Sequence, residues 1–268
     1  MIYNFVLVNY NNSKISLNCV NSIMKNNFKG NVLIIDNNSI DSEKLLLKDN
    51  RTFEVIFLKK NLGYGAALNR GIDFFIKKDG FDQLLIVGNN DLIYSNDFCN
   101  CLEHTSYPKD AMIISPDIIK TKNNVHQNPF SVNEFTKIER FKYKMLYLNY
   151  HITYLLFTIL NNKHCLRSEK NKNNFDKSCC IKMGHGACLI LLPSFLKRCR
   201  KLNVPLFMYG EELFISLQVE NEHGKIFYDN NVKVYHNEHR TIGNKLSREK
   251  FNYLKNAYTL YNSKKTYN

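Results

Sequence analysis

The chain has 268 residues, of which 44% are hydrophobic and 23% are charged, a balance that excludes a disordered or a fibrous protein. A formal net charge of +13 favours an anionic partner and leaves three classes open: nucleic acid, an acidic lipid surface and a phosphorylated small molecule. Part of the charge has a second explanation, since many lysines stand beside runs of asparagine, a bias that an AT-rich genome also produces.

Four short, continuous apolar runs predict strands buried on both faces, each a central parallel strand. The runs are Phe5-Val6-Leu7-Val8, Val32-Leu33-Ile34-Ile35, Val55-Ile56-Phe57-Leu58 and Leu84-Leu85-Ile86-Val87. Helical spacing follows the first run at Leu17, Val20, Ile23 and Met24, and the third at Ala67, Leu68, Ile72 and Phe75. Strand and helix in alternation predict βαβ units, an α/β fold with a mostly parallel sheet between helices, and ligands at the carboxyl ends of the strands.

Polar segments stand at the predicted carboxyl ends. They are Asn9-Tyr10-Asn11-Asn12, Asp36-Asn37-Asn38-Ser39, the glycine-rich 61–65 and Asn89-Asn90-Asp91. Because the strands are parallel, we expect these four loops to converge at one edge of the sheet.

The organisation changes at about residue 126. We expect a single domain over 1–268, with a first half over 1–125, a basic helical insertion over 126–180, a second half over 181–240, and a C-terminal helix over 245–264. The insertion contains the stretch 141–160, which is too polar to span a membrane. Its aromatic residues and flanking bases suit an anionic membrane surface. The alternative is a helix or helical pair packed on the protein's own core.

The cysteines and the amino terminus favour a cytoplasmic protein. Eight cysteines are scattered without the spacing of a zinc or redox motif, which predicts reduced thiols. Residues 1–10 enter a strand pattern without a secretory leader.

Several carboxylates and one histidine are candidates for chemistry. Asp36 ends a buried strand, where it either binds a base or ribose or forms a turn. Asp91 stands where one carboxylate can hold Mg²⁺ or Mn²⁺ on a diphosphate. Glu211 and Glu212 fall in the first turn of an amphipathic helix, where they either complement the helix dipole or supply a general base. His236 ends a strand and is either a metal ligand or structural.

The order of these motifs resembles the inverting glycosyltransferases of family two, with the GT-A fold, and in particular the rhamnosyltransferase-like branch that builds bacterial surface polysaccharides. The most specific similarity is the family pattern Asn-x-Gly-Phe-Gly-x-Ala-x-Asn-x-Gly. It matches Asn61, Gly63, Tyr64, Gly65, Ala67, Asn69 and Gly71, with tyrosine in place of phenylalanine. Family segments are also similar to Val8-Asn9-Tyr10-Asn11, Asp36-Asn37-Asn38-Ser39, Gly186-Ala187-Cys188-Leu189, Tyr209-Gly210-Glu211-Glu212 and Val234-Tyr235-His236.

The resemblance implies that 1–125 is the nucleotide-sugar-binding half and that 181–240 is the half with the acceptor site and catalytic base. It also implies roles for individual residues. Nucleotide binding is implied for Val8, Asn9, Tyr10, Asp36, Asn38, Asn61, Gly63, Gly65, Asn69, Asn89 and Asn90. Contact with acceptor or donor is implied for His185, Gly186, Ala187 and Tyr209. Asp91 and His236 would hold the divalent metal, although only the last carboxylate of the family's Asp-x-Asp remains. Glu212 replaces the family's catalytic aspartate, and Glu211 is the second candidate base.

We therefore predict a cytoplasmic enzyme, peripheral at the inner membrane face, that uses Mg²⁺ or Mn²⁺ to move a hexose or deoxyhexose from a UDP-, dTDP- or GDP-sugar to a glycan or lipid-linked glycan. Surface polysaccharide, such as capsule or lipopolysaccharide O-antigen, is the expected product. A catalytically impaired nucleotide-sugar-binding scaffold is the alternative. No nucleic-acid-binding motif is visible, and the first predicted strand lacks the glycine-rich basic loop of a sugar nucleotidyltransferase.

Overall fold

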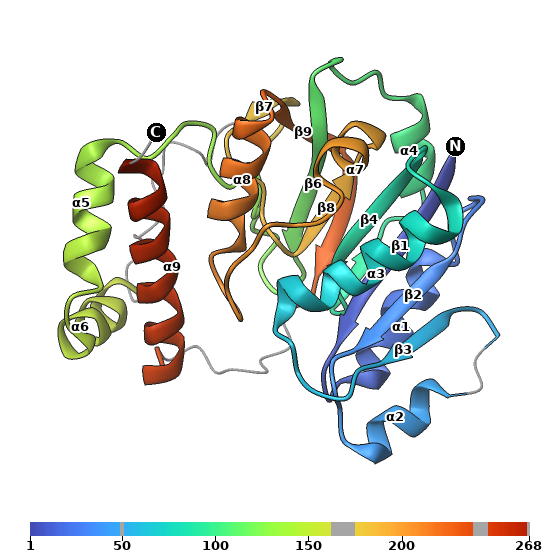
Figure 1. Cartoon of the computed structure of the whole chain (residues 1–268), viewed down its shortest axis with the longest axis horizontal. Helices are drawn as coiled ribbons and strands as arrows, with labels where there is room; N and C mark the ends of the chain where they lie inside the picture. Colours follow the sequence, from blue (N-terminus) through green and yellow to red (C-terminus); the bar gives the residue numbers. More distant parts are fainter. Residues whose placement is uncertain (49–50, 162–174, 238–245, 267–268) are drawn as a thin grey trace.

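The strands predicted from the first half of the chain lie side by side in one sheet (Figure 1). The computed structural model describes residues 1–48, 51–161, 175–237 and 246–266. β1 (Ile2–Asn9) pairs in parallel with β2 (Val32–Asp36) and β4 (Gln83–Asn89), and β3 (Glu54–Phe57) pairs in parallel with β2. The parallel βαβ half is confirmed.

One of these strands differs from the expectation. β3 is the edge strand of the sheet, with Glu54 and Phe57 exposed, whereas a central strand was predicted there. An apolar run indicates that a strand is at least partly buried, but it does not show whether the strand pairs with other strands on one side or on both.

The second half of the chain extends the sheet with mixed pairing. β8 (Cys188–Leu191) is antiparallel to β4, β6 (Ala111–Lys120) is antiparallel to β8, and β9 (Lys225–His236) is parallel to β6. The short β5 (Leu92–Tyr94) and β7 (Cys179–Ile181) pair antiparallel with β9. The order across the sheet is β3-β2-β1-β4-β8-β6-β9-β5.

Helices cover both faces of the sheet. Successive residues of a strand point to opposite faces, so Phe5 and Leu7 pack in one core with α1 (Ser13–Ile23) and α4 (Phe98–His104). Val6 packs in the other core, with α3 (Tyr64–Asp79), α7 (Pro193–Cys199) and α8 (Glu211–Asn221). The short α2 (Asp41–Leu47) contacts α1.

The predicted insertion contains a helical pair, α5 (Lys137–Leu146) and α6 (Tyr150–Asn161), which stands beside the C-terminal helix α9 (Arg248–Thr266) at the left of Figure 1. Tyr143 and Tyr147 stack on Tyr258 of α9, with ring centroids 4.7 and 5.1 Å apart. One face of the pair is therefore packed on the protein. None of the described helices is long and apolar enough to cross a membrane.

The first residues of the predicted insertion are not helical. His126 forms a bridge to Ile119 of β6, and Ser131 forms a bridge to Met183. The helical part begins only at Lys137, after the capping box that joins Thr136 and Glu139. The seven cysteines in the described ranges are free.

Candidate functional site

The polar loops converge, as predicted, through a hydrogen-bond network centred on Asn9. Its Nδ2 donates to Asp36 Oδ2 at 2.9 Å and to Ser39 Oγ at 3.2 Å. Its Oδ1 accepts from Asn90 Nδ2 at 3.2 Å and from Ser16 Oγ at 2.9 Å. Val8 and Asn89 are register partners on β1 and β4. These bonds join the carboxyl ends of β1, β2 and β4 into one floor.

Asp36 lies beneath the loops. It is 0% exposed, and besides the bond from Asn9 its Oδ1 accepts from the backbone N–H of Ser39 at 3.0 Å. The turn role that the sequence left open for Asp36 is therefore present. The exposed side chains above this floor are Tyr10 and Asn38, and Asn38 has a φ of +70°. Asp36 itself is covered by these loops.

The glycine-rich loop is held by neighbouring amides. Asn37 Nδ2 donates to Asn61 Oδ1 at 2.8 Å, and the N–H of Leu62 donates to Asn37 Oδ1 at 2.9 Å. Gly63 has a φ of +83°, and a Cβ there would lie 2.5 Å from the carbonyl oxygen of Phe207. A Cβ on Gly65 would lie 3.1 Å from Val204.

These glycines thus allow another segment of the same chain to approach the loop closely. The segment 203–207 lies against the loop, and Tyr64 N–H donates to the Phe207 carbonyl at 2.9 Å. Asn69 has a similar structural function, since its amide donates to the Leu202 carbonyl and accepts from the Leu202 N–H. The glycine motif therefore packs against the segment 203–207, which precedes Glu211 in the chain. The position of the motif in the sequence did not predict this contact.

Asp91 and His236 meet because β5 pairs antiparallel with β9, with Leu92 opposite His236. Asp91 Oδ1 lies 3.2 Å from His236 Nε2, yet this buried oxygen has no hydrogen-bond partner. An unsatisfied buried carboxylate oxygen beside an imidazole nitrogen fits a divalent cation such as Mn²⁺. Across the described ranges, no group of three or more His, Cys, Asp and Glu side chains is placed to hold a metal ion, so diphosphate oxygens and water would complete the coordination.

Glu211 and Glu212 open α8, as predicted. Tyr209 and Gly210 precede them with φ values of +63° and +82°. The backbone N–H of Gly186 donates to Glu212 Oε1 at 3.2 Å, and a Cβ on Gly186 would lie 2.5 Å from Glu211 Oε1. Both carboxylates therefore pack against one glycine.

The two carboxylates have different environments. Desolvation, and then the charge of Glu212, raise the pKa of Glu211 to about 8. Glu211 is accordingly mostly protonated at neutral pH. An ionised carboxylate beside it could accept a proton from a hydroxyl group.

Tyr64 links the glycine loop to the same place. Its hydroxyl donates to the carbonyl oxygen of Gly186 at 3.0 Å. Burial, followed by the charges of Glu211, Cys188, Asp91 and Glu212, raises its pKa well above the usual value. The carboxylates of Glu211, Asp91 and Glu212 thus all lie close enough to Tyr64 to raise the pKa of its hydroxyl. Tyr64 stands where the resembling family has phenylalanine, and this departure was the available signal for its role.

His185 and Tyr209, both expected to contact donor or acceptor, have contacts within the protein. Asn128 Oδ1 accepts from the His185 N–H at 2.9 Å, and Ala187 N–H donates to His185 Nδ1 at 3.1 Å. The Tyr209 ring lies 6.3 Å from that of Tyr253 on α9. Gln127 and Asn128 were not predicted as site residues because 126–180 was interpreted as an insertion.

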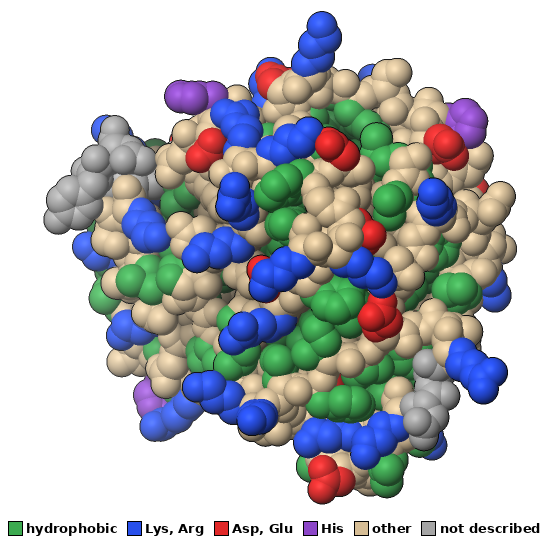
Figure 2. Space-filling model, turned by 45° about the vertical axis from the view of Figure 1, so that its right-hand side comes forward, with side chains coloured by type: hydrophobic (Ala, Val, Ile, Leu, Met, Phe, Trp, Pro, Cys, Tyr) green, Lys and Arg blue, Asp and Glu red, His purple; other side chains and the backbone are tan. Residues whose placement is uncertain are grey.

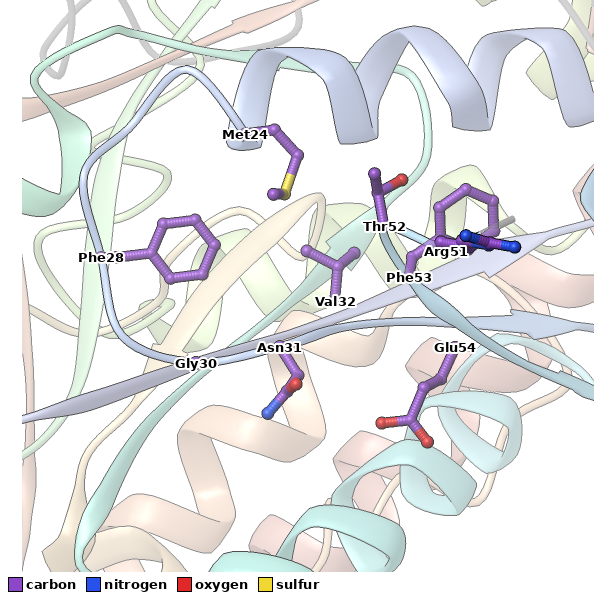
Figure 3. A pocket seen from close by; sticks show the side chains of 9 residues that line it. All are labelled: Met24, Phe28, Gly30, Asn31, Val32, Arg51, Thr52, Phe53 and Glu54. Carbon is purple, nitrogen blue, oxygen red and sulfur yellow. The ribbon is translucent and has the colours of Figure 1, made fainter. Parts of the chain in front are cut away.

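A pocket of about 270 Å³ lies elsewhere, at the amino ends of β2 and β3 (Figure 3). Apolar side chains including Met24, Phe28, Val32 and Phe53 line it. It is separate from the converging loops, which stand at the carboxyl ends. Figure 2 shows lysine and arginine side chains spread over the visible face between hydrophobic ones, not the continuous basic patch expected of a nucleic-acid-binding face.

Comparisons with known proteins agree with this geometry. The sequence model described as Glycosyl transferase family 2 matches residues 5–163, more than half of the chain. No curated protein matches the sequence.

Solved structures show the same fold. TarS 1–349 of S. aureus in complex with UDP-GlcNAc is 14% identical with a TM-score of 0.56, over 97% of this chain and 66% of that one. GalNAc-T7 with UDP, GalNAc and Mn²⁺ is 14% identical with a TM-score of 0.59, over 88% and 44%. The mannosyltransferase PcManGT from Pyrobaculum calidifontis, with GDP-Man and Mn²⁺, is 10% identical with a TM-score of 0.50, over 87% and 56%. The chain spans 60% of the length of a further TarS 1–349 structure. The likeness shows the GT-A fold.

Proposed function

The chain belongs to glycosyl transferase family 2, and from this premise we propose that it transfers a hexose or deoxyhexose from a nucleoside-diphosphate sugar to a hydroxyl group of a glycan or lipid-linked glycan. The observation that carries the proposal is the proximity of a candidate metal site to a candidate base. Asp91 Oδ1 lies 3.2 Å from His236 Nε2, and the His236 ring lies 6.0 Å from that of His185. The next residue, Gly186, donates its N–H to Glu212. We place the reaction at the cytoplasmic face of a bacterial membrane, in surface polysaccharide synthesis, as in the rhamnosyltransferase-like branch.

The proposed chemistry is a single displacement. Glu212 takes the proton of the acceptor hydroxyl as its oxygen forms a bond to the anomeric carbon of the sugar. The bond from that carbon to the diphosphate oxygen breaks, and the nucleoside diphosphate leaves with the electron pair. Attack opposite the leaving group inverts the anomeric configuration. Glu211, mostly protonated, keeps a second negative charge away from the base.

Donor binding is assigned to the loops. Tyr10 and Asn38 are exposed above the Asn9–Asp36 floor, and Asn89 and Asn90 are partly exposed beside it. Asp91 and His236 would hold Mg²⁺ or Mn²⁺, which when bound neutralises charge on the leaving diphosphate. Structural neighbours contain UDP, UDP-GlcNAc or GDP-Man, two of them with Mn²⁺, so uridine and guanosine donors are the first to test.

A donor screen tests this function. Thermal unfolding and sugar release are measured with UDP-, dTDP- and GDP-sugars, with and without Mn²⁺, for the wild type and Asp91→Ala. We expect one donor class to raise the unfolding temperature in a Mn²⁺-dependent way that Asp91→Ala abolishes, and NMR of the product to show inversion. Retention would refute the displacement. Tight donor binding without transfer to any acceptor would instead support the nucleotide-sugar-binding scaffold.

We also propose that α5 and α6 rest on an anionic membrane surface. Among the side chains that the structure describes on these two helices and the turn between them, the large hydrophobic ones that are exposed are Ile138, Phe141, Met145, Leu148, Ile152, Tyr154, Leu155 and Leu156. Lys137, Arg140, Lys142 and Lys144 stand among them on α5. Apolar side chains flanked by bases match the boundary between acyl chains and acidic headgroups. Lys163 and Arg167, also part of the predicted basic flank, lie outside the described residues.

Vesicle sedimentation tests the membrane contact. We expect binding to vesicles that contain phosphatidylglycerol, little binding to pure phosphatidylcholine, and release at high salt. The double variant Phe141→Ser and Leu155→Ser should lose binding. Leu45→Ser, at a similarly exposed leucine on α2, is the matched control and should retain it. Equal binding by both variants would exclude this face.

A further inference from the structure

Gln127 stands between two histidine rings. Its side chain is buried, and its backbone N–H donates to the Ile118 carbonyl at 2.7 Å, which fixes it against β6. Its Oε1 lies 2.7 Å from His236 Nδ1, and its Nε2 lies 3.2 Å from His185 Nε2. One amide therefore joins the Asp91–His236 pair to the loop that contains Gly186.

The oxygen end of the amide determines the tautomer of His236. Oε1 only accepts, so the neutral ring carries its proton on Nδ1 and donates it to Gln127. The lone pair of Nε2 then faces Asp91 Oδ1 at 3.2 Å, with no proton between two acceptors. This agrees with the lack of a hydrogen bond at that oxygen. The orientation suits a cation between the two atoms.

At the nitrogen end of the amide, His185 would have to accept two hydrogen bonds. Ala187 N–H already donates to His185 Nδ1 at 3.1 Å, while the Gln127 amino group faces Nε2. A neutral imidazole carries one proton, so it accepts at only one of its two nitrogens. One of these contacts must therefore weaken when the amide has this orientation.

Turning the amide by half a rotation reverses its contacts with the two histidines, because its two ends have the same shape. His185 Nε2–H then donates to Gln127 Oε1, the Gln127 amino group donates to His236 Nδ1, and His236 Nε2–H donates to Asp91. Ala187 N–H keeps its acceptor. All four contacts are satisfied in this orientation, but a proton occupies the position of the metal.

We propose that Gln127 is a positioning residue that couples occupancy of the Asp91–His236 pair to the loop 185–187. The inference rests on the metal role in the proposed function. With a divalent cation bound, the amide directs its oxygen to His236 and the contact between Ala187 and His185 loosens. Without the cation, the reversed amide closes that contact. Because Gly186 N–H also contacts Glu212, metal binding changes the surroundings of the base.

Two substitutions of Gln127 separate this role from simple packing. Gln127→Met keeps the approximate volume but cannot accept from His236. Gln127→Glu can only accept, so it holds the tautomer of His236 that binds metal. Loss of a group that orients a metal ligand typically lowers metal affinity 10- to 100-fold. We expect a loss of that size in Gln127→Met and affinity within a few-fold of the wild type in Gln127→Glu.

The measurement is titration with Mn²⁺ alone, followed by the electron paramagnetic resonance of free Mn²⁺, with thermal unfolding to confirm that each variant is folded. Gln218→Met is the matched control, since the Gln218 amide likewise bonds protein groups, the backbone of Asn203 and Lys201. It should bind Mn²⁺ like the wild type. His185→Phe removes the donor that favours the reversed amide and should bind Mn²⁺ a few-fold more tightly.

The outcomes distinguish the two claims. If the wild type binds Mn²⁺, Asp91→Asn does not, and Gln127→Met binds like the wild type, the coupling is refuted and the metal role stands. If both Gln127 variants lose binding equally, Gln127 has only a packing role. If the wild type does not bind Mn²⁺ alone, the coupling is refuted, and the donor screen decides the metal role in the presence of a diphosphate. Nitrogen-15 NMR of the metal-free wild type should show the Nε2–H tautomer at both His185 and His236.

Discussion

The backbone N–H of Gly186 donates a hydrogen bond to Oε1 of Glu212, 3.2 Å away. The bond joins the loop before β8 to the first turn of α8, residues that are 26 positions apart in the chain. It fixes the position of the Glu212 carboxylate against the loop 185–187. In the proposed function Glu212 is the base, and this bond is what would hold the base in place.

Glu212→Gln should abolish most of the turnover. The amide keeps an oxygen that can accept from Gly186, so the fold is retained, but it cannot take a proton. General base catalysis is worth about 10²- to 10⁴-fold, and we expect a loss of kcat in that range. The measurement is steady-state transfer with the donor found in the screen. Glu211→Gln is the comparison and should lose less; the reverse order would make Glu211 the base.

The raised pKa of Glu211 predicts a pH-dependent stability. Folding raises this pKa from 4.5 to about 8, through burial and then Glu212. The folded state thus binds the proton more tightly, and the contribution is complete below pH 4.5 and is lost as the pH rises through about 8. Glu211→Gln removes the dependence, so its unfolding temperature should exceed that of the wild type more at pH 9 than at pH 5. A constant difference would refute the assigned environment.

The sequence predicted local features well because they follow from local physical rules. Strands β1, β2 and β4 each contain a continuous apolar run because both of their faces are buried, and α8 begins at Glu211 after the left-handed Gly210. The convergence of the loops follows from parallel strands. These features require only the residue types and their spacing.

The contacts that complete the site are long-range and were not predicted. Gln127 and His236 are 109 residues apart, and Tyr64 and Gly186 are 122 apart. No spacing in one sequence encodes which distant carbonyl a hydroxyl will meet. From the sequence, Gly63 and Gly65 were interpreted as leaving room for a ligand. A glycine in a sequence indicates that another group comes close, but not which group it is.

Tyr64→Phe should destabilise the protein modestly. It removes the hydroxyl that donates to the buried carbonyl of Gly186, and an unsatisfied carbonyl of this kind costs about 1–3 kcal/mol. The ring itself is retained, and the resembling family has phenylalanine there, so the fold should persist. Urea unfolding of the variant beside the wild type measures the change. Tyr10→Phe, at an exposed tyrosine, is the control and should leave the free energy of unfolding unchanged.

Gly63→Ala should be more destabilising than an equivalent change elsewhere. The new Cβ would lie 2.5 Å from the Phe207 carbonyl oxygen, a backbone atom, and the φ of +83° is strained for alanine. Overpacking of this kind costs about 1–3 kcal/mol in addition to the backbone strain. Gly80→Ala provides a matched control, because Gly80 has a φ of +76° with nothing within 4 Å of a Cβ. Equal losses of stability in the two variants would show that the contact between a Cβ at position 63 and the Phe207 carbonyl does not lower the stability.

Asp91→Asn should lower activity while it leaves the stability of the metal-free protein nearly unchanged. In the metal-free protein we expect His236 Nε2–H to donate to Asp91 Oδ1, 3.2 Å away, and the oxygen of an asparagine can accept the same hydrogen bond. The change removes the charged metal ligand, so the Mn²⁺-dependent rise in unfolding temperature and the transfer activity should both be lost. Differential scanning calorimetry with and without Mn²⁺ measures the first effect, and a transfer assay measures the second. An unfolding temperature that still rises with Mn²⁺ in the variant would show that Asp91 does not hold the metal.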